Sequence, residues 1–317
     1  DRGITKRKSS ELIKEEISFQ KLKDFINQIS YFRPNITLFG GEPLIYPNCI
    51  ELIKYIKQKR LHCLLITNGS LLEENADDLF SAGLDELNVS LDGDKKIHDE
   101  VRGMPGLFEK IERGLKRIYA LKKENKTKKP LVNLQTTITK YNYIYLERLV
   151  DVAFAVGADS LTFHNLIFIS SDALSEQENI DRILKASSED WQGFLFSPDI
   201  DVELLYKKIK KIIAKKYTFS VDFYPNFSYK ELKQYYLNPK YRPQQYFARC
   251  LSPWITAYIF PDGEVRPCLN STYSFGNIKE DKFLRIWNSK RAVEFRRLLK
   301  KIKIFPVCVR CTELFRY

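Results

Sequence analysis

The sequence predicts an α/β protein in which helices cover a parallel sheet and a small cysteine-bearing domain follows. Between residues 19 and 167, short apolar segments alternate with segments whose apolar side chains recur at helical spacing. Four of the six cysteines lie after residue 249. We therefore expect one domain at residues 1–167, a helical and aromatic linker at 168–249, and a second domain at 250–317.

Five strands and five helices are expected in the first domain. The strands span residues 36–39, 63–67, 86–91, 131–139 and 160–166. The helices span residues 19–31, 49–58, 73–82, 107–122 and 145–156. Strands separated by such helices form parallel sheets, and this pattern fits an open doubly wound sheet or a partial barrel. In both folds, active-site residues lie at the carboxyl ends of the strands.

Residues 168–249 break this alternation. Helices are expected at 176–186 and 202–215, a strand-like segment at 218–223, and a Pro- and Tyr-rich stretch at 224–246. The segment contains too many aromatic residues for a disordered connection. Either its helices pack on the outside of the barrel, or residues 224–246 partly cover the substrate entrance with aromatic side chains.

Composition and charge exclude several classes of protein. Hydrophobic residues make up 44% and charged residues 29% of the chain, which is ordinary for a globular protein and excludes collagen or a coiled coil. We see no run of the ~18–20 apolar residues that cross a bilayer and no secretory signal, so we expect a cytoplasmic protein. The net charge of +12 would suit an acidic partner or, more simply, solvated lysine-rich helices. We do not expect a nucleic-acid partner.

Three successive strand ends carry groups that could bind an amino acid joined to a nucleoside. These groups belong to Gly40, Gly41, Glu42, Pro43, Asn68, Ser90, Asp92 and Arg102. The two glycines allow a ligand to approach the backbone closely, and the Glu42 carboxylate suits an ammonium group. The Arg102 guanidinium could hold a carboxylate with two hydrogen bonds. Each motif alone is an ordinary turn, so the prediction depends on the ordered set.

This ordered set resembles the radical S-adenosylmethionine (radical SAM) superfamily. The resemblance covers about residues 20–167 and rests on Gly40-Gly41-Glu42-Pro43, Thr67-Asn68-Gly69, Ser90-Leu91-Asp92-Gly93 and His98…Arg102-Gly103. It implies a partial (β/α)6 barrel that binds SAM beside a [4Fe–4S] cluster. It also implies that Gly40, Gly41 and Glu42 bind the methionine amino group. Ser90 would then meet the ribose or the carboxylate, and Arg102 the carboxylate.

The sequence departs from the superfamily at the cluster motif. Members hold their cluster with Cys-x3-Cys-x2-Cys after the first strand, and neither Cys49 nor Cys63 fits that spacing. Free cysteines in a helix and a strand are usually small buried apolar residues. Because the first residue is Asp1 and one of the six strands is also missing, we expect the motif to lie upstream. The alternative is a degenerate member without catalytic activity.

The second domain is defined by its cysteines. They are Cys250, Cys268, Cys308 and Cys311. Six cysteines are too few for a disulfide scaffold, and four thiolates suffice for one [4Fe–4S] cluster or one zinc ion. Spacing alone leaves both open. The hairpin expected at 261–268, the segment 275–278 and the helix-like 283–289 resemble the SPASM domain, or its shorter twitch form, over residues 248–312.

The SPASM resemblance implies auxiliary [4Fe–4S] clusters. Tyr317 stands where the full seven-cysteine pattern continues with a cysteine, which implies one auxiliary cluster with four protein ligands. Together, the two resemblances imply an oxidoreductase or maturase. Such an enzyme cleaves SAM reductively, using an electron donor such as flavodoxin or ferredoxin. The resulting 5′-deoxyadenosyl radical takes a hydrogen atom from the substrate.

Three functions remain open at this point. We expect modification of a peptide or protein. The first alternative is dehydrogenation or epimerisation of a sugar-like or other small metabolite. The second is a non-catalytic cluster- or zinc-binding protein. The sequence itself identifies no catalytic residue.

Overall fold

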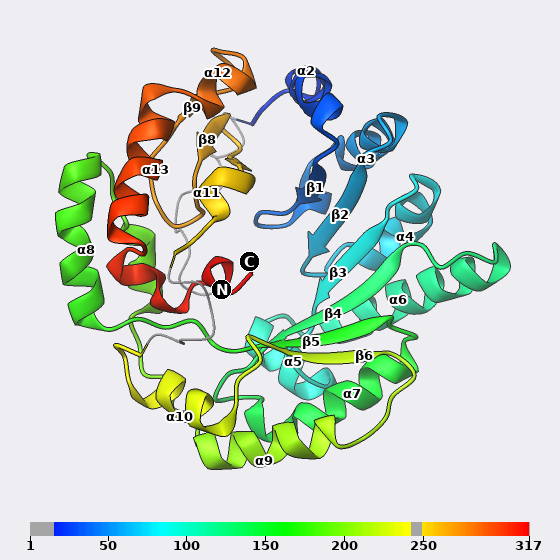
Figure 1. Cartoon of the computed structure of the whole chain (residues 1–317). Helices are drawn as coiled ribbons and strands as arrows, with labels where there is room; N and C mark the ends of the chain where they lie inside the picture. The colour runs from blue at the N-terminus through cyan, green and yellow to red at the C-terminus, as the bar shows by residue number, and fades with distance from the viewer. Residues whose placement is uncertain (1–15, 242–248, 317) are drawn as a thin grey trace. The chain divides into compact units, whose positions relative to one another are not determined.

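The structure is a computed structural model that describes residues 16–241 and 249–316 (Figure 1). The chain divides into two compact units. The barrel unit comprises residues 29–166 and 199–232, and the cysteine unit comprises residues 1–28, 167–198 and 233–317. Within the described part of the chain, we find no helix with the length and apolar character needed to cross a membrane.

The barrel unit is built on one six-stranded parallel sheet. Its strands are β1 (Asn35–Leu38), β2 (His62–Thr67), β3 (Glu86–Ser90), β4 (Leu131–Thr137), β5 (Ser160–His164) and β6 (Ser220–Tyr224). They follow one another in unbroken chain order. Right-handed crossovers in unbroken order place their helices on one face, as in a barrel rather than a doubly wound sheet. Figure 1 shows this sheet curving from β1 to β6 with helices outside it. The predicted α/β fold with a partial barrel is confirmed.

Helices cover the outer face of the sheet. They include α3 (Cys49–Gln58), α4 (Leu72–Ser81), α6 (Leu107–Glu124), α7 (Leu146–Ala155) and α9 (Val202–Ile213). Each buries an apolar stripe against the sheet, for example Ile53 and Ile56 of α3. The helices α4 and α6 pack closely at Gly114, where an added Cβ would lie 2.9 Å from the Glu73 amide nitrogen.

The cysteine unit contains a small antiparallel sheet and a helical layer. The sheet is formed by β7 (Tyr258–Ile259), β8 (Glu264–Arg266) and β9 (Gly276–Asn277). The helices are α2 (Phe19–Ile29), α8 (Ser171–Leu184), α10 (Tyr229–Leu237, which crosses the unit boundary), α11 (Ser252–Ile255), α12 (Phe283–Trp287) and α13 (Lys290–Ile302). The expected hairpin is confirmed, and its turn has Gly263 at φ 92°.

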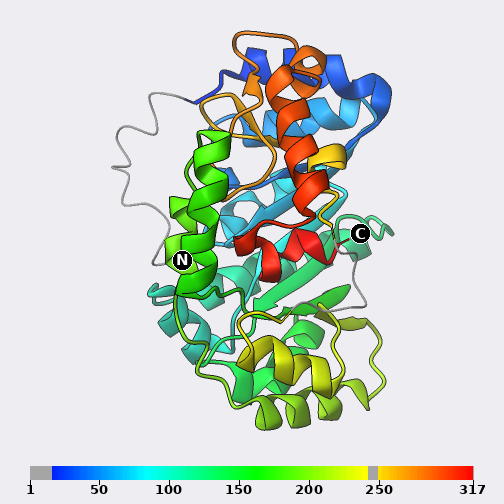
Figure 2. The ribbon, with the colours of Figure 1, turned by 60° about the vertical axis from the view of Figure 1, so that its left-hand side comes forward.

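One apolar core holds the cysteine unit together. Phe275 and Phe295 lie at its centre with ring centroids 5.9 Å apart. The helix α8 contributes Ile180 and Leu184 to the same core. Figure 2 shows α8, in green, beside the red segment that follows α13. Helix α2 joins through Phe25. This is the α+β domain that the sequence predicts, extended by helices from two earlier parts of the chain.

The segment expected to be a linker contributes to both units. Helix α8 belongs to the cysteine unit, whereas α9 and β6 belong to the barrel unit. Helix α8 begins five residues before its expected start, because the Ser170 hydroxyl caps it by accepting from the Ala173 amide. The domain bounds expected from the sequence remain a prediction.

Aromatic residues of this segment take part in packing. Phe223 stacks on Phe163 with centroids 4.8 Å apart, and Tyr235 and Tyr236 are buried against Phe168. These contacts agree with the packing interpretation for these residues. Residues 242–246 of the proposed cover over the substrate entrance lie outside the described residues.

Candidate functional site

The first strand end is organised by the Glu42 carboxylate, which is 9% exposed. One carboxylate oxygen accepts from the Leu44 amide at 3.1 Å and the Thr67 hydroxyl at 2.8 Å. The other accepts from the Asn68 amide at 2.7 Å. The Thr67 hydroxyl also accepts from the Gly69 amide. The carboxylate therefore joins the turn after β1 to the turn after β2.

The backbone beside Glu42 is left open. Gly40 and Gly41 are exposed, and a Cβ added to either would meet no atom within 4 Å. No packing contact therefore requires glycine at these two positions. Pro43 begins the 3-10 turn η2 (Pro43–Ile45), for which Glu42 is the N-cap. The turn thus presents its main chain while its acidic side chain points back into the protein.

The third strand end is organised by an ion pair. The Arg102 Nε donates to the Asp92 carboxylate at 2.7 Å, and the Asp92 amide donates to His98 Nδ1 at 3.1 Å. Both His98 and Arg102 lie on α5 (Lys95–Arg102), one turn apart and thus on one face. This helix begins at the Asp94 cap and ends at Gly103 with φ 64°. The Arg102 guanidinium is held from one side and 22% of its side chain is exposed.

His98 supports this turn in its neutral form. The side chain is fully buried, and burial lowers the pKa of His98 to about 4, although the nearby Asp92 carboxylate acts in the opposite direction. At neutral pH its Nδ1 is therefore available to accept the Asp92 amide proton. Asn142, in the loop after β4, holds the same turn, because its side-chain amide donates at 2.9 Å to the carbonyls of both Asp92 and Thr137.

The three strand ends lie along one edge of the sheet. In the ladder, Leu38 pairs with Leu65, and Thr67 pairs with Val89. Ser90 ends β3 half-buried at this edge, and the Asn68 side chain accepts from the Ser70 amide at 2.8 Å. Of the predicted residues, Glu42 and Asn68 are thus joined by a hydrogen bond in one group, and Asp92 and Arg102 in another. The assignment of these residues to a ligand remains a prediction.

Sequence reasoning did not assign a role to three residues of this edge. Thr67 precedes Asn68-Gly69 and could have been found from strand alternation, since it is buried at the end of β2. His98 is part of a motif that the sequence identified, although its burial could not be seen there. Asn142 had no signal, because its partners lie elsewhere in the chain.

The four C-terminal cysteines belong to one unit. Cys250 precedes α11, Cys268 follows β8, and Cys308 lies in the 3-10 turn η5 (Pro306–Arg310). The Cys311 amide donates to the Cys308 carbonyl at 3.1 Å, which closes the turn between these two residues. Both side chains pack against an apolar cluster that includes Trp191.

Burial keeps these four thiols in their protonated form. Their side chains are half-buried, and burial raises the pKa of Cys268 and Cys311 to about 12. Burial also raises the pKa of Cys250 and Cys308, and the pKa of Cys308 is further raised by the other three thiols. A metal bound by this set would therefore have to displace these protons.

The thiols are gathered without converging on one point. Among the described residues, no three Cys, His, Asp or Glu side chains are arranged as ligands of a single metal ion. The thiols nevertheless act on one another electrostatically, which places them in one neighbourhood.

The remaining cysteines do not form a second cluster site. Cys49 lies in α3 and Cys63 in β2, where they are 4% and 0% exposed. Burial raises the pKa of each thiol to about 12. Both are core residues, and two thiols in such positions do not fit a cluster that needs three ligands.

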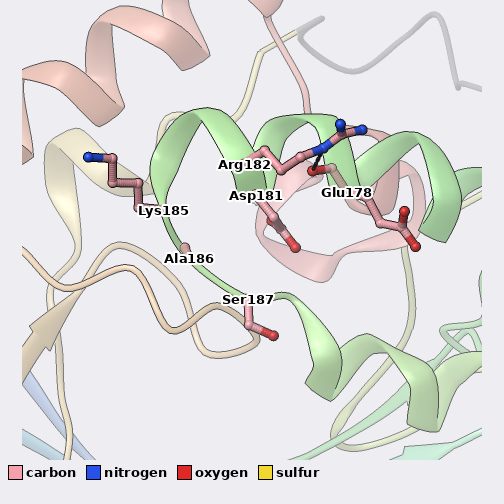
Figure 3. A pocket seen from close by; sticks show the side chains of 6 residues that line it. All are labelled: Glu178, Asp181, Arg182, Lys185, Ala186 and Ser187. Carbon is pink, nitrogen blue, oxygen red and sulfur yellow. Dashed lines mark hydrogen bonds between the residues drawn. The ribbon is translucent and has the colours of Figure 1, made fainter.

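Surface hollows do not identify the site. One lies along the end of α8 and is lined by Glu178, Asp181, Arg182, Lys185, Ala186 and Ser187 (Figure 3). Within it, the Asp181 carboxylate already accepts from the Ser188 amide at 2.8 Å. A second hollow lies at the end of α6 among lysines such as Lys123 and Lys126. Neither contains a residue of the strand-end or cysteine site.

Two family models match the chain. The model described as "Radical SAM superfamily" matches residues 5–153. The SPASM model, described as "Iron-sulfur cluster-binding domain", matches residues 250–312.

Curated relatives match most of the chain at low identity. An AdoMet-dependent heme synthase of Methanosarcina barkeri is 27% identical over 93% of this chain and 80% of its own length. A Fe-coproporphyrin III synthase of the same organism is 27% identical over 86% of this chain and 66% of its own length. A tungsten-containing aldehyde ferredoxin oxidoreductase cofactor-modifying protein of Pyrococcus furiosus is 24% identical over 86% and 72%.

Solved structures share the fold. Streptococcus suis SuiB bound to precursor peptide SuiA has a TM-score of 0.62 at 14% identity, covering 92% of this chain and 63% of SuiB. The chain thus spans less than two thirds of SuiB. Native anSMEcpe with bound AdoMet and Cp18Cys peptide has a TM-score of 0.53 at 18% identity, covering 95% and 80%. Identities this low establish a common fold alone.

Proposed function

Because the chain belongs to the radical SAM superfamily and carries a SPASM domain, we propose that it cleaves SAM reductively and removes a hydrogen atom from a substrate. Membership implies SAM, a [4Fe–4S] cluster and auxiliary iron–sulfur clusters, which are the cofactors expected from the sequence. When bound, SAM and the barrel cluster supply a 5′-deoxyadenosyl radical. The observation that carries the proposal is the ordered set of polar groups at the ends of β1, β2 and β3.

Within this set, Glu42 would act by holding the glycine turn. Its oxygens already accept from two main-chain amides and the Thr67 hydroxyl. The open main chain of Gly40 and Gly41 would then receive the ammonium group of SAM. This proposed role differs from the direct contact between the Glu42 carboxylate and the ammonium group that the sequence analysis expected.

Arg102 would bind the carboxylate of SAM. Its Nε is engaged by Asp92, and the outer nitrogens of the guanidinium can still donate to a second carboxylate. The fixed partner on one side orients the group for the ligand on the other. Ser90 and Asn68 would bind the ribose or the carboxylate from neighbouring strand ends.

Cys250, Cys268, Cys308 and Cys311 would hold one auxiliary [4Fe–4S] cluster. With four protein thiolates, every iron would have a protein ligand and none would be free to bind substrate. The cluster would therefore transfer electrons or stabilise the fold of the domain. Tyr317, which bears on the number of clusters, lies outside the described residues.

For the substrate, we propose a peptide or protein side chain. Two solved structures of the same fold were determined with peptides, and the net charge of +12 suits an acidic peptide. A second candidate is a tetrapyrrole, because relatives that are 27% identical are named heme synthase and Fe-coproporphyrin III synthase. Its propionate groups would suit the same positive charge. A flavodoxin or ferredoxin would supply the electron, and we expect a cytoplasmic location.

The test uses the product of the whole gene, purified anaerobically. With dithionite and SAM it should form 5′-deoxyadenosine, and Arg102→Ala should weaken SAM binding. Deuterated acidic peptides and deuterated Fe-coproporphyrin III are then compared for deuterium transfer into 5′-deoxyadenosine. Transfer from the peptide alone supports the first substrate class, and transfer from the tetrapyrrole alone supports the second. A protein that neither binds nor cleaves SAM would instead be the non-catalytic cluster-binding protein.

A further inference from the structure

The sheet of the barrel unit has an outer face that helices cover and an inner face that they do not (Figure 1). Val89 of β3 lies on the outer face, because its side chain and that of Ile111 on α6 both reach within 3.5 Å of a Cβ added at Gly69. Successive side chains of a strand point to opposite faces, so the next residue, Ser90, lies on the inner face. The strand register then assigns the side chains of β4 and β5 to one face or the other.

A row of polar residues crosses this inner face near the amino ends of the strands. It consists of Asn88, Asn133 and Ser160, which the register pairs directly. The Ser160 hydroxyl donates to Asn133 Oδ1 at 2.6 Å, and Asn133 Nδ2 donates to Asn88 Oδ1 at 2.9 Å. The side chains of this row are therefore bonded to one another.

A second row lies two residues nearer the carboxyl ends. It consists of Ser90, Gln135 and Thr162, which the register again pairs directly. All three are half-buried. Within the described part of the chain, no hydrogen bond joins any of these three side chains to another group. The second row therefore keeps polar groups that can bind a ligand, whereas the first row does not.

His164 extends this unpaired set at the end of β5. It lies two residues after Thr162 on the same face, and its ring centroid is 5.6 Å from that of Tyr224 on β6. Its Nε2 is buried and has no hydrogen-bond partner among the described residues. Burial lowers the pKa of His164, so at neutral pH its imidazole is uncharged, with one nitrogen that donates and one that accepts. Buried polar atoms are nearly always paired in proteins, so Nε2 is available to a bound group.

The strands place no cation beside these groups. None of the six strands β1 to β6, all of which are described, contains Lys or Arg. The register does place Glu86 and Asp222 on the inner face. A carboxylate brought to this wall would therefore leave water without gaining a cation, which is costly. An amide or a hydroxyl could instead exchange hydrogen bonds with Gln135 and Thr162.

We propose that Gln135, Thr162 and His164 are specificity-determining residues that bind an uncharged polar side chain of the peptide substrate, a carboxamide or a hydroxyl. The inference rests on the proposed function, in which Ser90 meets SAM and the radical forms on the ribose. Neighbouring strands lie about 4.8 Å apart, so Gln135 is one strand and Thr162 two strands away from Ser90. The inference concerns the residue that loses its hydrogen atom rather than the charge on the rest of the peptide.

The test compares two peptides that differ only in charge at the reacting residue. Gly-Ala-Asn-Ala-Gly and Gly-Ala-Asp-Ala-Gly, each deuterated only at the central residue, are incubated anaerobically at equal concentration with the whole gene product, dithionite and SAM. Mass spectrometry measures the fraction of 5′-deoxyadenosine that carries deuterium. We expect this fraction to be at least about tenfold higher with the amide peptide. Deuterated Fe-coproporphyrin III, whose propionates are charged, should also give a lower fraction than the amide peptide.

A matched pair of variants on β5 tests the placement. Thr162→Val removes a hydroxyl of the unpaired row at nearly constant shape, and Ser160→Ala removes the hydroxyl that is bonded to Asn133. Thr162→Val should lower the deuterated fraction with the amide peptide about fivefold, which corresponds to the loss of one hydrogen bond. His164→Phe should lower it by a similar factor. Ser160→Ala should lower thermal stability and leave the deuterated fraction unchanged.

The outcomes separate this inference from the function on which it rests. A wild-type protein that forms no 5′-deoxyadenosine would contradict the proposed function and, with it, the inference. A wild-type protein that forms 5′-deoxyadenosine would contradict the inference alone if the amide peptide transferred no deuterium, or no more than the acidic peptide or the tetrapyrrole. Equal deuterated fractions in Thr162→Val and Ser160→Ala would also contradict it. If Thr162→Val does not fold, His164→Phe takes its place in the comparison with Ser160→Ala.

Discussion

The barrel unit and the cysteine unit each contain a proposed cofactor site, and the two differ in how charge is balanced. At the strand ends, Glu42 accepts hydrogen bonds from the next turn, and Arg102 is paired with Asp92. At the cysteine site, burial keeps the thiols protonated. There, within the described residues, the hydrogen bonds of the Arg310 guanidinium end on main-chain carbonyls. The charged side chains of the first site are thus paired within the protein, whereas the thiols of the second would become charged only on binding the proposed cluster.

This difference predicts different responses to loss of the ligand. A site whose side chains satisfy one another keeps its geometry when the ligand leaves, and its variants should change affinity more than folding. A site that depends on metal couples binding to folding, because only the metal makes thiolates of its buried cysteines. Chelation should therefore loosen the cysteine unit and leave the barrel unit folded.

The largest effect is expected from the cysteines. Changing Cys308 and Cys311 together to Ala should abolish cluster binding, because two of four ligands are lost. The measurement is iron and sulfide per chain after anaerobic reconstitution, with thermal unfolding followed in parallel. Cys49→Ala is the control, since this buried thiol lies in the barrel core and its loss should leave the iron content unchanged. A colourless wild-type protein with stoichiometric zinc would contradict the iron–sulfur assignment.

The next effect concerns the pH dependence of the barrel unit. The pKa of His98 falls from 6.5 to about 4 on folding because of burial, so the unfolded chain takes up a proton first as the pH falls. The contribution of His98 to the free energy of unfolding is fully present above pH ~6.5. It decreases by about 3 kcal/mol as the pH falls from ~6.5 to ~4. About 2 kcal/mol of this should be lost between pH 7 and pH 5. Burial also lowers the pKa of His164, which adds to the loss in the same direction.

Urea unfolding of the full chain at pH 7 and pH 5 measures this dependence. His98→Gln should flatten the pH profile. His62→Gln should retain it, because His62 is partly exposed and lies 3.1 Å from the Glu86 carboxylate. A wild-type pH profile in His98→Gln would show that the buried imidazole is not the source.

Local features of both units could be predicted from the sequence, and long-range contacts could not. Helix and strand periodicity placed β1 to β5 and their helices, and parallel topology placed Asn68 and Ser90 at one edge. The strand β6 was expected only as a strand-like part of the linker, because more than fifty residues separate it from β5. The Asn142 contact to Asp92 spans fifty residues, and the Arg310 contact to Tyr235 spans seventy-five. Nothing local in the sequence marks such partners.

A smaller effect is expected from Arg102. Charge-assisted hydrogen bonds contribute about 1.5–3 kcal/mol, so Arg102→Ala should weaken SAM binding by roughly 10–150-fold. Arg148→Ala is the control, since Arg148 pairs with Asp94 at 2.8 Å but its side chain is 58% exposed. The control should change affinity by less than about threefold. The measurement is a binding titration of the whole gene product with SAM. Equal SAM affinities of Arg102→Ala and Arg148→Ala would show that Arg102 does not bind SAM.

The smallest effect is expected from substitution of Gly41. Comparison with Gly69 distinguishes a glycine that a ligand requires from a glycine that the fold requires. An added Cβ at Gly41 meets no atom within 4 Å, so Gly41→Ala should change the free energy of unfolding by less than ~0.5 kcal/mol. Gly69 has φ 79°, and its added Cβ would lie 2.4 Å from Cγ1 of Ile111, so Gly69→Ala should cost more than ~1 kcal/mol. If SAM approaches the main chain at Gly41, the methyl group of Gly41→Ala should weaken SAM binding by about 1 kcal/mol, or roughly fivefold. Unchanged SAM affinity would mean that the ligand does not approach this turn, and a large loss of stability would mean that the turn is packed rather than open.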